Sequence, residues 1–204
     1  METYFAAAYW GHRPESVDSC AKRLSQFLVD ISLISESFKE WRKQGRSRVD
    51  AKRKKTINAM DVVELISMLD SGRIRRDVSK EVIDSLGYSA SLWNGAGEEN
   101  VASLMIGCGM YSNVVGLSNA VVLSLPSNFD VNSGVLQKGL MSAFVNSWDP
   151  DWAVIASHSA RDEVDDHVPF LDKALYLSKA YSQAESARSG GIALSNGVLY
   201  LAAI

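Results

Sequence analysis

The chain has 204 residues and a formal net charge of −3, with 47% hydrophobic and 22% charged residues. These values are typical of a globular protein with one sizeable core. No apolar run reaches the length of about 18 residues that a membrane-spanning helix needs. The N-terminus also lacks the basic and apolar regions of a secretory signal. We therefore expect one compact domain over residues 1–204, located in the cytoplasm and without a membrane partner.

The two parts of the chain carry opposite charge. Residues 1–80 hold 16 Lys and Arg against 11 Asp and Glu, whereas residues 81–204 hold 5 against 13. The positive excess lies mainly in Lys39–Lys55, which has nine basic residues. The acidic part can present a negative face to a basic partner.

A strand and an amphipathic helix open the chain. Tyr, Phe and Trp favour a strand over Thr3–Trp10, which Gly11 ends. Apolar residues then recur at steps of three and four. This spacing predicts a helix over about 14–34, with Pro14 in its first turn.

Residues 35–88 form a possible helical insertion or subdomain with a basic loop. Within this segment, Asp61 is placed to cap a helix that Gly72 stops. The remaining expected elements are a short helix over Ser35–Gln44, a mobile polar loop over Gly45–Thr56 and a short helix over about 79–86.

The second half of the chain alternates strands and turns. Ser133 is placed to cap a helix that Pro150 ends, and the apolar run Trp152–Ala156 predicts a central strand covered on both faces. Further strands are expected at Ser89–Asn94, Ala102–Cys108, Asn119–Leu125, Ala174–Leu177 and Gly197–Ile204. The fold class is therefore α+β, with a mostly antiparallel central sheet of about five to seven strands and flanking helices.

Three groups of residues are candidates for partner binding. An acidic cluster after a predicted strand can imitate phosphates and occupy a basic cleft, although a solvated loop is the alternative interpretation. Three arginines beside a helix end can clamp a carboxylate or pair within the fold. Trp93 adjoins a Gly-rich turn, where a partly exposed ring is a typical interface anchor, while the other four tryptophans are expected in the core. The acidic residues are Asp162, Glu163, Asp165 and Asp166, and the arginines are Arg73, Arg75 and Arg76.

Neither catalysis nor metal binding is predicted. The three histidines lack the spacing of a zinc pair. A nucleophilic site of Cys20 with His158 or His167 remains an alternative, but Cys20 lies on the apolar stripe of the predicted helix, where a thiol is inert core. We expect a binding protein with no catalytic residues, cofactor or metal site. A second alternative is a nucleic-acid-binding module that uses the basic segment 39–55.

Several short segments resemble, in order, the immunity protein 52 family. They are Tyr9–Ser16 with the helix Cys20–Leu28, the Phe38…Trp41…Gly45 segment, the Gly72…Arg75-Arg76-Asp77 stretch, and Trp148-Asp149-Pro150-Asp151-Trp152. These segments span most of residues 4–157. Ala174–Ser178 is similar to the late strand of the family but lacks its flanking Gly-Trp.

The resemblance implies a bacterial immunity protein that binds and neutralises a cognate toxin effector. Members of this family commonly accompany toxins with a restriction-endonuclease fold, some of them delivered by type VI secretion. The implied partner is such a DNase, with no direct contact to nucleic acid. Acidic groups of the immunity protein can then compete for the sites on the toxin that DNA phosphates would occupy.

Overall fold

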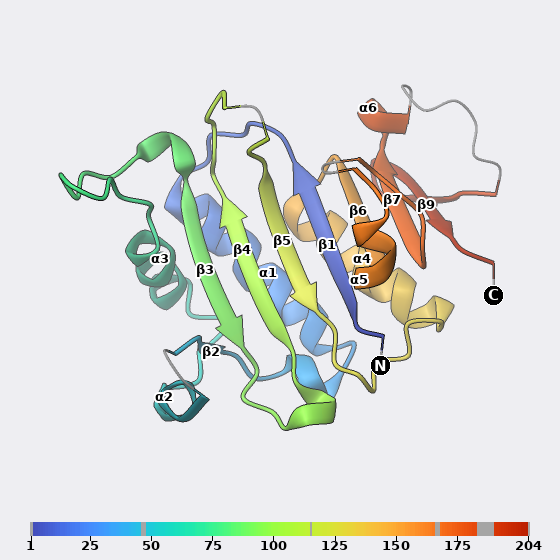
Figure 1. Ribbon diagram of the computed structural model, residues 1–204, viewed down its shortest axis with the longest axis horizontal. Helices are drawn as coiled ribbons and strands as arrows, with labels where there is room; N and C mark the ends of the chain where they lie inside the picture. Colours follow the sequence, from blue (N-terminus) through green and yellow to red (C-terminus); the bar gives the residue numbers. More distant parts are fainter. Residues whose placement is uncertain (1, 46–47, 115, 166–167, 183–189, 204) are drawn as a thin grey trace.

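A computed structural model describes residues 2–45, 48–114, 116–165, 168–182 and 190–203. Within these residues, one antiparallel sheet of nine strands runs through the molecule in the order β2-β3-β4-β5-β1-β6-β7-β9-β8 (Figure 1). The strands are β1 (Tyr4–Trp10), β2 (Arg42–Lys43), β3 (Tyr88–Trp93), β4 (Ser103–Cys108), β5 (Asn119–Ser124), β6 (Trp152–Ser157), β7 (Ala174–Ser178), β8 (Ile192–Leu194) and β9 (Gly197–Leu201). The helices are α1 (Val17–Ser32), α2 (Arg48–Arg53), α3 (Val62–Ser71), α4 (Gly134–Trp148), α5 (His158–Asp162) and α6 (Lys179–Ser182).

The α+β fold with an antiparallel sheet is confirmed, and seven of the strands correspond to the seven predicted ones. The two additional strands, β2 and β8, have two and three residues and form the two edges of the sheet. Strands this short carry no readable alternation of polar and apolar residues, and very short edge strands are a common way to end a sheet.

Helices α1, α3 and α4 cover one face of the sheet, and in Figure 1 they lie behind the strands. Leu24 of α1, Leu65 of α3 and Phe144 of α4 are fully buried in one core cluster with Ala6 and Ala8 of β1. Small side chains on a central strand allow the helices to approach the sheet closely. Two of the three alanines that weaken the strand propensity of β1, Ala6 and Ala8, therefore lie where packing against the helices favours them.

The predicted caps of these helices are present. Ser133 accepts a hydrogen bond from the backbone N–H of Leu136, and Asp61 accepts one from Glu64. Helix α1 begins at Val17, later than predicted, because Ser16 caps it by accepting from the backbone N–H of Ser19.

The opposite face of the sheet is covered over only part of its width. Around β6 and β7, a second cluster joins Phe5, Trp152 and Leu175 with the partly buried Phe170 and Tyr181. Every residue of β6 is buried, which confirms the prediction of a strand covered on both faces. Figure 1 shows α5 in front of this part of the sheet, while no helix of the described residues lies on the same side of β3, β4 and β5.

Three local predictions in the segment 35–88 are wrong. The expected helix over Ser35–Gln44 is a single 3₁₀ turn at Glu36–Phe38 followed by β2. The expected basic loop over Gly45–Thr56 contains α2, because Ala51 is buried and anchors a short helix. The expected helix over about 79–86 is a 3₁₀ turn, Asp84–Leu86, preceded by a hairpin-like arm in which Arg75 and Val82 form a β-bridge.

Candidate functional site

The two tryptophan-containing segments of the sequence meet at one end of β1 and β6. Tyr9 and Trp152 are partners across the two strands, and their rings stack at 4.3 Å between centroids. Asp151 accepts a hydrogen bond from the backbone N–H of Gly11 at 2.8 Å, and its own N–H donates to the Tyr9 carbonyl at 2.9 Å. Segments about 140 residues apart therefore form one rigid junction.

At this junction, two arginines bind backbone carbonyl groups at the C-terminal end of α4. Arg13 donates to the carbonyl oxygens of Trp148 at 2.5 Å and Asp149 at 3.0 Å, and Arg23 donates to that of Ser147 at 2.8 Å. Glu15 binds both guanidinium groups, at 3.0 and 2.6 Å. A helix end leaves its last carbonyls without partners, and cations there also complement the helix dipole. These residues carry the family resemblance, and in this structure they connect the start of α1 to the end of α4.

The uncovered part of the sheet presents uncharged side chains, and we call it the open sheet face. Its residues alternate with the buried Leu92, Leu104 and Val121 along their strands. Met105, at its centre, is 58% exposed and pairs with Ser91 and Val122 in the neighbouring strands. The open sheet face consists of Ser91, Trp93, Ser103, Met105, Gly107, Ala120, Val122 and Ser124.

Two of the predicted binding groups border the open sheet face. Trp93 is half-buried at the end of β3, opposite Arg42 of the edge strand β2. Asp162 and Glu163 are exposed at the end of α5. This helix covers the same side of the sheet over β1 and β6. There, the ring centres of His158 and Phe5 lie 5.1 Å apart. Asp165 is also exposed, and Asp166 lies outside the described residues.

The three predicted arginines lie on the arm that precedes β3. Arg73 forms ion pairs with Asp70 and Asp84, and its guanidinium lies 5.7 Å from the centre of the Tyr88 ring. Arg75 donates to the Lys80 carbonyl at 3.1 Å. The exposed Arg76 bonds through its backbone N–H to the Glu81 carbonyl. The structure thus spreads these side chains along an arm instead of bringing them together around one site.

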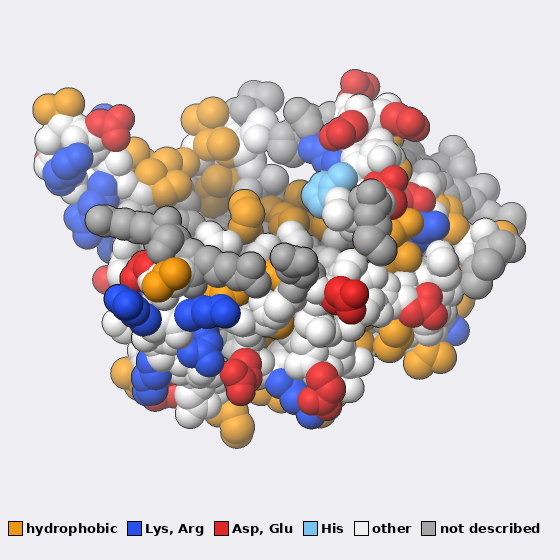
Figure 2. All heavy atoms as spheres, turned by 60° about the horizontal axis from the view of Figure 1, so that its bottom comes forward, with side chains coloured by type: hydrophobic (Ala, Val, Ile, Leu, Met, Phe, Trp, Pro, Cys, Tyr) orange, Lys and Arg blue, Asp and Glu red, His pale blue; other side chains and the backbone are white. Residues whose placement is uncertain are grey.

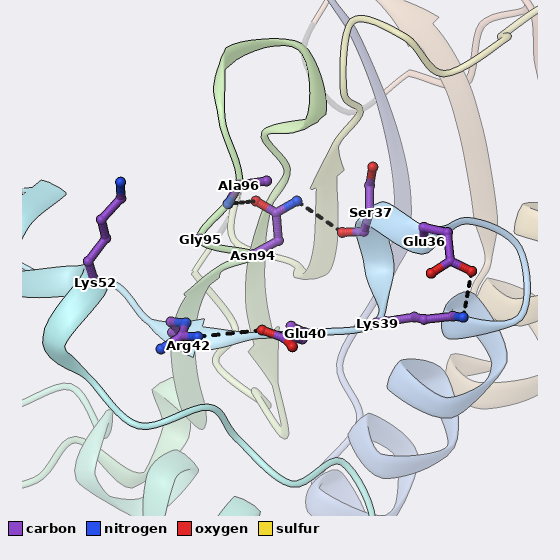
Figure 3. A pocket seen from close by; sticks show the side chains of 9 residues that line it. All are labelled: Glu36, Ser37, Lys39, Glu40, Arg42, Lys52, Asn94, Gly95 and Ala96. Atoms are coloured by element: carbon purple, nitrogen blue, oxygen red, sulfur yellow. Dashed lines mark hydrogen bonds and ion pairs between the residues drawn. The ribbon is translucent and has the colours of Figure 1, made fainter.

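The basic segment 39–55 lines a cavity of about 570 Å³ at the β2 edge (Figure 3). Lys39 pairs with Glu36 at 2.5 Å, and Arg42 pairs with Glu40 at 3.4 Å. Lys54 pairs with Asp50 at 3.8 Å. Carboxylates thus offset part of the positive charge that a phosphate would need, and nucleic-acid binding by this segment stays a prediction.

A second cavity, of about 350 Å³, opens beside the junction of β1 and β6. We call it the aromatic pocket. Its walls include Tyr9, Trp152, Tyr181 and Leu117, together with Asp151. Burial raises the pKa of Tyr9, and a hydrogen bond and the positive charge of Arg161 oppose that shift in part. Arg161 of α5 therefore lies near the hydroxyl of this ring.

The structure separates Cys20 from His158, one of the two histidines of the hydrolase alternative, while the other, His167, lies outside the described residues. Cys20 is fully buried in the helix-covered core, whereas His158 contacts Phe5 in the cluster on the other face of the sheet. A hydrogen bond with Cys20 and burial raise the pKa of the Cys108 thiol well above its usual value. Among the described residues, no group of three or more His, Cys, Asp or Glu is placed to hold a metal ion. No helix in the described part of the chain is long and apolar enough to cross a membrane.

The sequence patterns predict neither the open sheet face nor the aromatic pocket. A signal for the open sheet face exists in Ser103-Leu104-Met105-Ile106-Gly107-Cys108, where small or flexible residues alternate with buried ones. Such alternation is typical of an antiparallel strand with one uncovered face. The pocket has no comparable signal, because its walls come from four separate parts of the chain.

Comparisons with known proteins agree with this fold and place the chain in a family. Among solved structures, the Pseudomonas aeruginosa T6SS protein PA0821 is similar in fold, with a TM-score of 0.53 and 9% identity over 98% of this chain and 68% of that one. No curated protein sequence matches the chain significantly. The sequence model of immunity protein 52 matches residues 2–185. The chain therefore belongs to the immunity protein 52 family.

Proposed function

We propose that this protein binds a cognate toxin effector through the open sheet face and neutralises it by direct contact. The observation that carries the proposal is the half-covered sheet, in which β3, β4 and β5 expose a neutral surface beside the acidic residues Asp162, Glu163 and Asp165 at and after the end of α5. Membership of an immunity protein family supports a toxin as the partner. The finer proposal is that the toxin is a nuclease with a restriction-endonuclease fold and that both proteins meet in the bacterial cytoplasm.

The composition of the open sheet face suits a protein interface. Interface centres are depleted in charged residues, while their rims are polar and charged. Met105 and Val122 supply an apolar centre, and Trp93 lies at one border. The small residues Ser, Gly and Ala surround them and allow a partner to approach the strands closely.

The two borders of the open sheet face differ in charge. In Figure 2, Lys and Arg gather towards the left of the molecule, and Asp and Glu gather towards the right. The acidic side includes Asp162, Glu163 and Asp165. A nuclease presents cations where it holds DNA phosphates, so this acidic border suits a position across the DNA path. Opposed charges also orient the two proteins before contact.

The proposal is tested with the protein encoded beside this gene. We expect that toxin to co-purify with the immunity protein and to stop cleaving DNA in the complex. The substitution Met105→Glu puts a charge at the centre of the open sheet face and should weaken the complex about tenfold or more, because an unpaired carboxylate would be desolvated there. Isothermal titration calorimetry measures this loss.

The matched control is Val63→Glu, at a residue of α3 that is 75% exposed on the helix-covered side. It introduces the same charge and should leave the affinity unchanged. Equal affinities of both variants would remove the open sheet face from the interface. A neighbouring gene product that neither binds nor loses its activity contradicts the proposed function itself.

A further inference from the structure

The aromatic pocket combines three features that suit one kind of side chain. It opens beside the Tyr9–Trp152 stack, it has the further ring of Tyr181 in its wall, and it includes the carboxylate of Asp151. Its volume of about 350 Å³ lies at the lower end of the range found for ligand pockets. We propose that this pocket binds an arginine or lysine side chain of the toxin, an inference that rests on the proposed function.

The carboxylate supplies the charge. Asp151 uses its Oδ2 atom to accept from the N–H of Gly11 at 2.8 Å. A carboxylate offers about four acceptor positions, so capacity remains for a charged donor entering the pocket. Hydrogen bonds between a cation and a carboxylate are roughly twice as strong as those between neutral groups.

The rings supply the second attraction. The faces of Trp and Tyr attract cations within about 6 Å of the ring centre, and this attraction grows when water is excluded. The chain already uses it next to the pocket, where the guanidinium of Arg13 lies 4.9 Å from the centre of the Trp10 ring. Arg13 itself is held by Glu15 and by the Trp148 carbonyl at the end of α4, and Arg161 interacts with the hydroxyl of Tyr9 at the pocket wall.

The position of the pocket connects it to the proposed interface. Tyr9 and Trp152 lie on the same side of the sheet as Ala120 of the open sheet face, which is the strand partner of Tyr9. Leu117, in the loop before β5, is 42% exposed at the pocket wall. A partner lying across the open sheet face can therefore insert one long side chain at this end. The side chains that dominate binding energy commonly fill a pocket of the partner protein.

The test uses two small probes with the isolated protein. N-acetyl-arginine amide carries the cation, and N-acetyl-citrulline amide has the same shape without the charge. We expect the arginine probe to shift the indole N–H resonance of Trp152 in ¹H–¹⁵N spectra with a dissociation constant in the millimolar range, as suits a single side chain. The citrulline probe should bind at least about fivefold more weakly.

Variants locate the site. Asp151→Asn keeps an acceptor for the Gly11 N–H but removes the charge, so it should weaken the arginine probe about fivefold or more. Asp130→Asn removes an equal charge outside the pocket and should leave binding unchanged. Equal binding of the two probes, no shift of Trp152 at about 50 mM probe, or unchanged affinity of Asp151→Asn would each overturn the cation site.

The same variants separate this inference from the proposed function. A toxin complex that forms at full affinity with Asp151→Asn shows that the pocket is not used, although the toxin is still bound. Probe binding without any toxin complex shows the reverse, namely a cation site in a protein whose proposed partner is wrong.

Discussion

At the scale of single residues, the side chains that carry the family resemblance mostly stabilise contacts within the fold. Arg13, Glu15 and Arg23 connect the start of α1 to the end of α4 through ion pairs and carbonyl contacts. Asp149 adopts the left-handed conformation, with φ of 46°, and so ends α4 before Pro150. Residues that hold the fold together can therefore identify the family without identifying the binding surface.

Tyr176 provides a prediction at this scale. It is fully buried, its hydroxyl has no hydrogen-bond partner among the described residues, and burial followed by the charge of Asp149 raises its pKa from 10.0 to about 12. The neutral phenol is favoured in the folded state. The stability it contributes is therefore fully present below pH 10 and is lost as the pH rises towards about 12.

The variant Tyr176→Phe should remove this pH dependence. We expect its free energy of unfolding at neutral pH to equal or exceed that of the wild type by up to about 1 kcal/mol, because a buried hydroxyl without a partner is removed. Between about pH 9.5 and 11.5, the wild type should lose roughly 2 kcal/mol more than the variant. Urea unfolding at both pH values measures the difference, and identical losses in the two proteins would contradict the assignment.

At the scale of elements, the two faces of the sheet differ in how much of each is covered. Its helix-covered face is continuous from β3 to β9, while its other face is covered only around β6 and β7. The arrangement depends on close contact between the end of α3 and β3. Gly72 caps α3, and a Cβ atom at this residue would lie 1.8 Å from the carbonyl oxygen of Ser89.

Gly72→Ala should therefore separate α3 from β3. We expect a loss of about 1–3 kcal/mol in the free energy of unfolding, as for an overpacked core. Gly97→Ala is the matched control, since a Cβ atom there meets nothing within 4 Å and the φ of −75° suits alanine. It should be neutral or slightly stabilising in thermal unfolding. A small effect at Gly72 would show that α3 can move without cost.

At the scale of the whole molecule, the charge asymmetry of the sequence becomes an asymmetry in space. The basic segment 39–55 contains β2, one edge of the sheet, and the acidic residues near α5 lie towards the other side. Such a distribution affects the rate and orientation of association more than the final affinity. Under the proposed function, the chain would steer a basic partner without charged groups at the centre of the proposed interface.

Reversing Asp162, Glu163 and Asp165 to Lys tests this steering. Association with the toxin should slow about tenfold at low salt, and the difference from the wild type should shrink as salt screens the charges. Stopped-flow mixing measures the rate constants. Reversing Glu40, Asp77 and Glu81, on the β2 side, changes the net charge equally and should slow association less. Equal effects of the two triple variants would show that only net charge matters.

The sequence alone determined the longer elements and the fold class. Periodic apolar residues located α1, α3 and α4, and apolar or alternating runs located seven strands. The prediction failed for β2, β8, α2, α5 and α6, which are too short for a pattern and depend on contacts such as the burial of Ala51. Of the predicted binding residues, Trp93 and the described acidic residues border one face, while Arg73, Arg75 and Arg76 lie apart on an arm.

Tertiary structure decided which parts of the sheet are covered and which surfaces remain. Local sequence records the period of each element, since that follows from backbone geometry. It does not record which helix crosses which strand, and α5 reaches β1 only because β6 pairs with it. The aromatic pocket depends in the same way on Tyr9, Leu117, Trp152 and Tyr181, which only the complete sheet brings together.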